Sequence, residues 1–130
     1  MGGMETLGSR RALVIDDETM VRTMLADALE VFGYAVDAVD SGKAALACFA
    51  AGRYHVVMTD LLMPDMSGLE VVEKLRRVDP SVPMILLTGA GGGSVSTDTR
   101  AEGVLMIYKP VSLMKLKAAL ETRCQRAVGV

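Results

Sequence analysis

Residues 55–68 read His55-Val-Val-Met-Thr-Asp60-Leu-Leu-Met-Pro-Asp-Met-Ser-Gly68. The run 56–59 is short, apolar and β-branched, which is typical of a strand buried on both faces of a parallel sheet. A turn follows, because proline fixes φ and glycine tolerates positive φ. Asp60 stands where the strand ends, and ligands bind at the carboxyl ends of strands in an open parallel sheet. Its position therefore predicts a chemical role for its carboxylate.

Other apolar runs alternate with amphipathic stretches on both sides of this strand. We expect the remaining strands at residues 11–15, 35–39, 83–88 and 104–108. Helices are expected after the first, second and third strands and at the end of the chain, each with apolar residues at intervals of three and four. This alternation predicts an α/β fold, a doubly wound parallel sheet of five strands with about five helices.

Capping residues and glycines place the helix ends. Gly33 is expected to end the first helix, and Ser41 and Ser112 to begin two later ones. Residues 94–102 predict a weak helix at best, because they are rich in Ser and Thr and offer little to bury. We expect this segment to be short or mobile.

Composition narrows the class of protein. The chain has 130 residues, is 51% hydrophobic and carries a net charge of −2, which fits one well-packed domain and gives a poor footprint for direct binding to nucleic acid. Cys48 and Cys124 lie in apolar helical patterns and are expected to be free thiols, as in a reducing cytoplasm. There is no apolar run long enough to span a membrane. Residues 1–9 are interpreted as a loose leader and 10–127 as the domain, with no second, output domain.

Polar residues collect where the predicted strands end. These residues are Asp16, Asp17, Asp60, Thr88 and Lys109. Because the carboxyl ends of parallel strands share one edge of the sheet, we expect their side chains to meet. Each has an ordinary structural explanation when it is taken alone: a helix cap, a turn residue or a surface lysine. Together and in this order, they predict a site.

Three crowded carboxylates repel one another unless a cation joins them. The side chains at these strand ends offer only oxygen ligands, which favours a hard divalent ion, Mg²⁺ above all. A metal ion, a lysine and a hydroxyl around one carboxylate suit a phosphoryl group, whose transfer needs positioning and charge neutralisation. Asp60 is then the nucleophile that forms an aspartyl-phosphate.

These motifs resemble the receiver domain of two-component response regulators. The resemblance runs from about Arg11 to Arg126 and rests on Val-Ile-Asp-Asp-Glu at 14–18, Thr-Asp-Leu-Leu-Met-Pro-Asp-Met-Ser-Gly at 59–68, Leu-Leu-Thr-Gly at 86–89 and Tyr-Lys-Pro at 108–110. It implies a flavodoxin-like fold with strand order 2-1-3-4-5. It also implies a signalling protein, not an enzyme acting on outside substrates, although it promotes its own phosphorylation and dephosphorylation.

The resemblance assigns roles to individual residues. Asp60 would accept a phosphoryl group from a phosphohistidine on a sensor histidine kinase or a histidine phosphotransfer protein. Asp17, Asp60 and the backbone carbonyl of Leu62 would bind Mg²⁺, with Asp16 acting through water. Lys109 and Thr88 would hold the phosphoryl oxygens. The activated form would act on a downstream protein, with homodimerisation left open.

Two departures from the family pattern concern switching and phosphate loss. The family places an aromatic switch residue three positions before the lysine, where this chain has Met106; Tyr108 shares the strand face of Met106 and is the other candidate, with Thr88 as the moving hydroxyl. Leu62 and Ala90 occupy the positions that flank the attacking water in the family. Both are apolar, so we expect slow loss of the phosphoryl group.

Two other functions compete with phospho-acceptance. A Mg²⁺-dependent phosphatase resembling the haloacid dehalogenases would need a second aspartate two residues after the nucleophile as a proton donor, and this chain has Leu62 there. A receiver-like docking module that acts without phosphorylation is the main alternative. The presence of Asp16, Asp17, Asp60, Thr88 and Lys109 argues against this alternative, whereas Met106, in place of the family's aromatic residue, argues for it.

Overall fold

The computed structural model describes residues 10–89, 95–96 and 104–128 of the chain. Its strands and helices follow one another along the chain in the order β1 Arg11–Ile15, α2 Thr19–Val31, β2 Ala35–Val39, α3 Gly42–Cys48, β3 Val56–Asp60, α4 Gly68–Val78, β4 Met84–Thr88, β5 Val95–Ser96, β6 Val104–Tyr108 and α5 Leu113–Val128. No helix among the described residues has the length and apolar character needed to cross a membrane.

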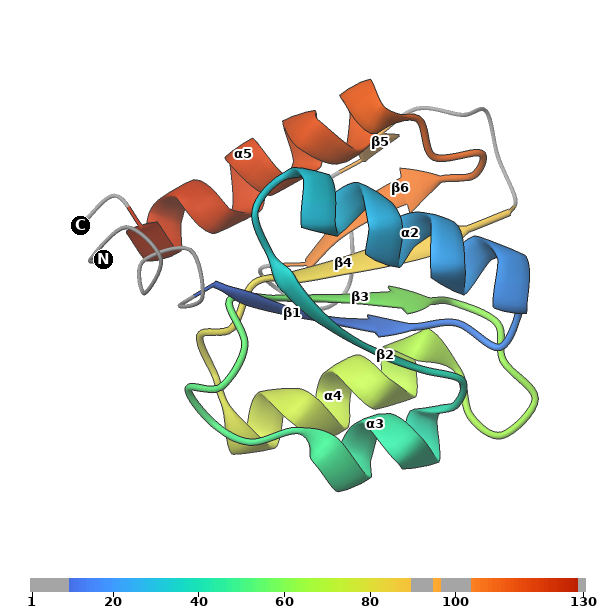
Figure 1. Cartoon of the computed structure of the whole chain (residues 1–130). Helices are drawn as coiled ribbons and strands as arrows, with labels where there is room; N and C mark the ends of the chain where they lie inside the picture. Colours follow the sequence, from blue (N-terminus) through green and yellow to red (C-terminus); the bar gives the residue numbers. More distant parts are fainter. Residues whose placement is uncertain (1–9, 90–94, 97–103, 129–130) are drawn as a thin grey trace.

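The sheet has the order β2-β1-β3-β4-β6-β5. The first five strands in this order are parallel, so the predicted doubly wound sheet with order 2-1-3-4-5 is confirmed. β3 lies at the centre, and all five of its residues are buried. The register places β1, β3, β4 and β6 with their carboxyl ends along one edge of the sheet (Figure 1).

Helices cover both faces of the sheet. α2 and α5 lie on one face, and α3 and α4 lie on the other (Figure 1). Side chains alternate between the two layers, as the two-residue period of a strand requires. Val56 and Met58 of β3 pack with α2 and α5, whereas Val57 packs with α3 and α4. The two hydrophobic layers therefore fix the register of the sheet, because a one-residue slip would exchange the faces.

Gly33 and Ser41 end and begin helices as expected, and Ser67 is a further cap that was not among those expected from the sequence. Gly33 has φ +95° directly after α2, a conformation that favours glycine. The Ser41 hydroxyl accepts from the amide of Ala44 and begins α3. The Ser67 hydroxyl accepts from the amide of Glu70 and begins α4. Each cap satisfies an amide at a helix N-terminus, where intrahelical partners are missing.

The expectation of a weak helix at 94–102 was wrong where the structure describes that segment. Val95 and Ser96 form the short strand β5, which pairs antiparallel with β6 at Ile107 and Met106. The other residues of the expected helix lie outside the described ones, as do the leader at 1–9 and Ala90. The described part of the chain accordingly contains four helices.

Candidate functional site

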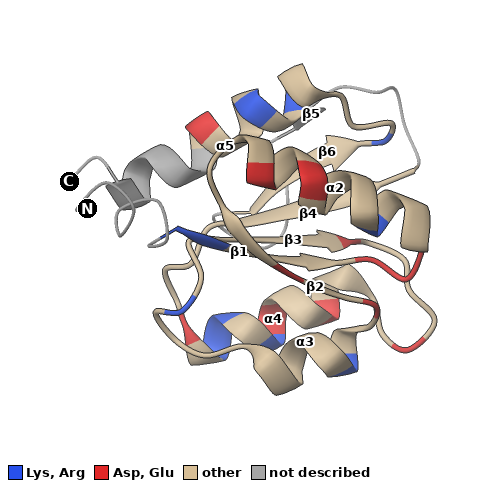
Figure 2. Cartoon of the chain, in the orientation of Figure 1, with Lys and Arg blue, Asp and Glu red and all other residues tan. Residues whose placement is uncertain are grey.

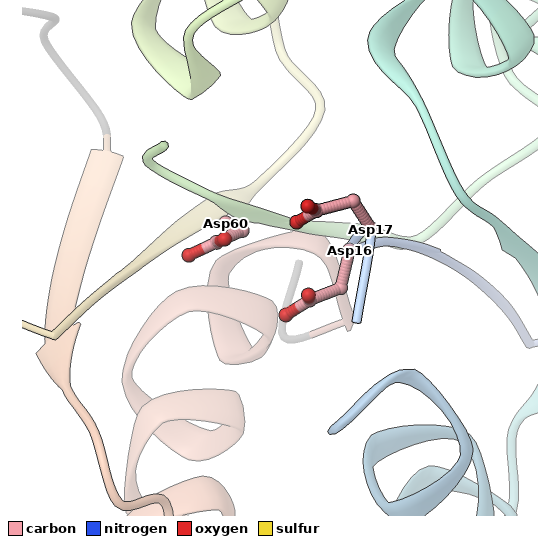
Figure 3. A group of neighbouring side chains, drawn as sticks. All are labelled: Asp16, Asp17 and Asp60. Atoms are coloured by element: carbon pink, nitrogen blue, oxygen red, sulfur yellow. The ribbon is translucent and has the colours of Figure 1, made fainter. Parts of the chain in front are cut away.

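Three carboxylates gather at the carboxyl edge of the sheet. Asp16 and Asp17 follow β1, and Asp60 is the last residue of β3. Carboxylate oxygens of all three lie within 4.8 Å of one another (Figure 3). The strands place them, because β1 and β3 are direct neighbours in the sheet and end side by side. The sequence-based expectation that these side chains meet is confirmed.

Lys109 brings a positive charge to this cluster. It directly follows β6, and its ammonium lies 3.2 Å from Oδ1 of Asp60 and 3.4 Å from Oδ2 of Asp16. The Lys109 amide donates to the carbonyl of Thr88 at 2.7 Å, which ties the residue to the end of β4. Lys109 thus reaches the cluster from two strands away from β3, across the end of β4.

Burying these charged side chains costs free energy of folding. Asp16 is fully buried and Asp60 nearly so, whereas Asp17 is exposed. Burial raises the pKa of the Asp60 carboxyl above its ordinary value, contact with Lys109 opposes the shift, and the charges of Asp16 and Asp17 add to it. Burial lowers the pKa of Lys109, but its contacts with Asp60 and Asp16 outweigh burial and leave that pKa raised. The site therefore favours the charged form of Lys109 and, relative to a solvated carboxyl, the protonated form of Asp60, which a further cation would oppose.

This donor set fits a divalent cation. Carboxylate oxygens close to one another, with surplus negative charge and no sulfur or imidazole ligand among the clustered residues, match the preference of Mg²⁺ for hard oxygen ligands. Asp16 already has two partners, since its Oδ1 accepts from the amide of Glu18 at 2.9 Å and its Oδ2 contacts Lys109. Asp17 is exposed, and the Asp60 carboxylate contacts one ammonium, that of Lys109. These two carboxylates therefore have the most lone pairs left to bind a metal ion.

Thr88 and Tyr108 lie beside each other at the ends of neighbouring strands. The register of β4 and β6 pairs them directly. Two residues earlier on each strand, and so on the same face, it pairs Met106 with Leu86. Thr88 is almost fully buried, and Met106 packs in the layer of α3 and α4. Of the two candidates for the switch residue, Tyr108 is the one that pairs with the threonine.

The loop after β3 exposes Leu62. Its side chain is 73% exposed, whereas Met63 and Met66 of the same loop pack partly buried against the layer of α3 and α4. Leu62 is two residues beyond Asp60, so its backbone lies at the same edge of the sheet as the carboxylates. The position agrees with the predicted role of its carbonyl, which stays a prediction.

Two basic side chains that the sequence did not single out support the loops of the site. Arg22 of α2 donates to the backbone carbonyl of Asp16 at 2.9 Å. Lys115 of α5 donates to the carbonyls of Tyr108 and Pro110, at 3.1 and 3.2 Å, and so brackets Lys109. Arg22 and Lys115 both donate to backbone carbonyls, which leave no signal in the sequence. The one hint is that each is a cation near the start of a helix, where the helix dipole disfavours positive charge.

Fold and site together define an α/β receiver-type signalling domain, with an acidic cluster and a lysine at the carboxyl edge of a parallel sheet. The family model of the response regulator receiver domain matches residues 12–121, and the chain belongs to this family, whose members serve two-component systems.

Similar proteins agree with this family. The transcriptional regulatory protein TcrA of Mycobacterium tuberculosis is 34% identical over 119 residues, which cover 89% of this chain and 46% of that protein. A receiver domain protein from Clostridium thermocellum has a similar structure, with a TM-score of 0.79 and 27% identity over 92% of this chain and 97% of that one. The response regulator protein TrrA of Thermotoga maritima, solved in complex with Mg(2+)-BeF, has a TM-score of 0.75 and 32% identity, covering 87% of this chain and 97% of that one.

The chain spans about half the length, or less, of curated relatives such as TcrA. Several of these relatives are named as transcriptional regulatory proteins. The expectation that this chain acts without direct contact with nucleic acid, which rested on its charge, has no support from them.

Proposed function

We propose that the chain is the phospho-accepting receiver of a two-component system or phosphorelay, with Asp60 as the acceptor. The observation that carries the proposal is the environment of Asp60: a nearly buried carboxylate, 3.2 Å from the Lys109 ammonium and beside two further carboxylates. A carboxylate held in this way is oriented for attack, and its neighbours are suited to charge that develops on a phosphoryl group.

In the proposed reaction, Asp60 attacks the phosphorus of a phosphohistidine on a sensor histidine kinase or a histidine phosphotransfer protein. One carboxylate oxygen supplies the electron pair of the new O–P bond. The P–N bond breaks, and its electron pair returns to the imidazole nitrogen, which takes up a proton. Lys109 and the Thr88 hydroxyl bind the phosphoryl oxygens. The reaction needs positioning more than covalent help.

Mg²⁺ would be held by the carboxylates of Asp17 and Asp60 and the carbonyl of Leu62, with Asp16 acting through water. When it is bound, this ion supplies positive charge against the phosphoryl oxygens and the crowded carboxylates. The TrrA complex with Mg(2+)-BeF supports this part of the proposal, because that similar receiver accepts the same kind of ion.

Phosphorylation is proposed to change a protein-binding face through Thr88 and the end of β6. A phosphoryl group at Asp60 draws the Thr88 hydroxyl toward it, and the space behind Thr88 is then open to its strand neighbour Tyr108. Met106 is the alternative switch residue. The downstream partner is proposed to be a protein, and a second copy of this chain is one candidate. The proposed compartment is the cytoplasm, where the kinase domain would also lie.

Intact-mass measurement after incubation with acetyl phosphate and Mg²⁺ tests the proposal. The wild-type chain is expected to gain one phosphoryl mass, and Asp60→Asn or a metal chelator to prevent the gain. A wild-type chain that gains nothing, with the metal present and the fold intact, would instead favour a docking module that acts without phosphorylation.

A further inference from the structure

The loop between β3 and α4 is closed at its base. The amide of Leu61 donates to the carbonyl of Leu87, and the amide of Gly68 donates to the carbonyl of Leu61, both at 2.7 Å. Gly68 packs so closely that a Cβ there would lie 2.3 Å from the backbone oxygen of Asp60. The two ends of the loop are therefore fixed to the site and to each other.

The tip of the same loop is attached to a different element. The Asp65 carboxylate accepts from the amide of Lys43 at 2.9 Å and from the amide of Gly42 at 3.3 Å, the first two residues of α3. These bonds bridge 22 and 23 residues of sequence. The hydrogen bond from Lys43, followed by that from Gly42, lowers the pKa of Asp65, so the carboxylate is charged at neutral pH.

An apolar contact supports this attachment. The side chain of Met66 lies against Gly42, where an added Cβ would be 2.4 Å from Cγ of Met66. The absence of a side chain at the start of α3 thus lets the loop approach the helix closely. Asp65 and Met66 together hold the loop tip on α3.

The backbone of Leu62 lies between these two attachments. Three residues separate Leu61 from Asp65, and one of them, Pro64, has a fixed φ. The Leu62 side chain is largely exposed and does not anchor its own peptide. The orientation of the Leu62 carbonyl therefore depends on the base of the loop, on the packing of Met63 and on Asp65.

We propose that Asp65 is a positioning residue: by fixing the loop tip to the N-terminus of α3, it holds the Leu62 carbonyl where it can bind a divalent cation. The inference rests on the proposed function, which makes that carbonyl a metal ligand. Supporting residues outside the ligand set commonly set metal affinity, and their loss costs roughly ten- to a hundredfold. Asp65 would act in this way through the backbone, three residues from the ligand it orients.

Two substitutions at Asp65 remove its hydrogen bonds to different extents. Asp65→Ala removes both acceptor oxygens and the charge, whereas Asp65→Asn removes the charge and one acceptor and keeps the other, because its amide nitrogen cannot accept from a backbone amide. Asp79 offers a matched control at the opposite edge of the sheet, since its carboxylate also accepts from two backbone amides, those of Gly52 and Ser81, at 3.1 and 3.2 Å. Asp79→Ala thus removes a similar loop attachment far from the carboxylate cluster.

The experiment is a Mg²⁺ titration of each variant of the 130-residue chain, followed through the backbone amide signals in NMR, with urea unfolding measured alongside. We expect Asp65→Ala to bind Mg²⁺ about tenfold more weakly than wild type, Asp65→Asn to recover part of that loss, and Asp79→Ala to bind as wild type does despite a similar loss of stability.

Two results would overturn the inference alone: wild-type affinity in Asp65→Ala, or an equal loss in Asp79→Ala, which would assign the effect to general loosening of the loops. If Asp65→Ala does not fold, the comparison of Asp65→Asn with Asp79→Asn decides in its place: the inference predicts weaker Mg²⁺ binding than wild type in Asp65→Asn alone, and equal affinities in the two variants would overturn it. A wild-type chain that binds no Mg²⁺ would overturn the proposed function itself, and this inference with it.

Discussion

Two clusters of charged residues in this molecule carry opposite surplus charges: one has more carboxylates than cations, and the other has more cations than carboxylates. At the carboxyl edge of the sheet, where acidic segments drawn in red follow β1 and end β3 (Figure 2), three carboxylates lie together, and the Lys109 ammonium contacts two of them, Asp16 and Asp60. Nearer the amino ends of the strands, the single carboxylate of Asp37 contacts two guanidinium groups, those of Arg11 at 3.0 Å and Arg53 at 3.6 Å. It also accepts from the Tyr54 hydroxyl at 2.7 Å.

The difference separates a site from a structural network. In the Asp37 cluster the carboxylate is contacted by Arg11, Arg53 and the Tyr54 hydroxyl. The ring of Phe49 stacks on that of Tyr54, with 5.7 Å between the ring centroids. Burial, followed by the bond to Asp37, raises the pKa of Tyr54, so the phenol stays protonated. The Asp60 cluster carries unmatched negative charge in a buried place, which costs stability. Such a cost is typical of residues kept for binding or catalysis.

The largest expected effect is on phosphoryl transfer to Asp60. We expect Lys109→Met to lower the rate of phosphorylation by acetyl phosphate by about a hundredfold, because one charged donor to the phosphoryl oxygens is lost. Time-resolved intact-mass measurement checks the rate. Lys115→Met, which removes a lysine that contacts only backbone carbonyls in the described structure, is the control and should cost much less; equal losses would contradict the assignment of Lys109.

The Asp37 cluster should show the opposite pattern, a loss of stability without a loss of phosphorylation rate. We expect Asp37→Ala to reduce the free energy of unfolding by about 2 kcal/mol, because the buried Tyr54 hydroxyl loses its acceptor and two guanidinium groups lose a partner. Urea denaturation measures the loss. The phosphorylation rate of the folded variant should stay within about twofold of wild type, since this cluster makes no contribution to transition-state charge; a large rate loss would place it in the site.

Stability against pH should distinguish the two clusters further. The folded pKa of Asp60 lies above its unfolded value, so the folded state binds the proton more tightly and stability falls as pH rises from the unfolded pKa through the folded one. Without metal, the advantage of Asp60→Asn in the free energy of unfolding should grow across that window and then level off. Mg²⁺ at ten times its dissociation constant should stabilise the wild type by about 1.4 kcal/mol. An advantage that stays constant with pH would contradict the raised pKa.

The smallest expected effect concerns loss of the phosphoryl group. Leu62 is apolar and cannot orient an attacking water, so the wild-type phosphoryl group should outlast a few seconds. Leu62→Gln should shorten its half-life a few-fold, because the amide can hold a water near the acceptor. Val31→Gln is a matched control, since Val31 is 74% exposed and Leu62 73%, and Val31 ends α2 away from the carboxylate cluster. Equal half-lives in wild type and Leu62→Gln would show that this side chain does not govern the rate.

The strand ends could be predicted from the sequence, and the loop attachments could not. β1, β3, β4 and β6 are continuous apolar runs that stop at polar residues, so their pattern fixes both the sheet and the edge where Asp60 and Lys109 meet. Asp65 follows a proline in a turn, and its pattern indicates a turn residue and nothing more. Its partners on α3 are backbone amides 22 and 23 residues away, and backbone amides are the same at every residue but proline.

The short strand β5 was missed for a related reason. The sequence at 94–102 has weak helix propensity, and two residues are too few to show the alternation of a strand. Their pairing with β6 is a tertiary interaction, which routinely overrides weak local preference. The roles of Met106 and Tyr108 are equally hard to read from the sequence, because both lie on one strand face; the register with Thr88 is what favours Tyr108.

The most direct test of Asp60 as the acceptor is to locate the phosphoryl group. After incubation with acetyl phosphate and Mg²⁺, borohydride reduction converts a phosphorylated aspartate to homoserine, and peptide mass spectrometry locates the change. We predict homoserine at position 60, dependent on Mg²⁺ and absent when the phosphoryl donor is omitted. An unmodified Asp60 in a folded chain, or homoserine at another aspartate such as Asp37, would contradict this assignment.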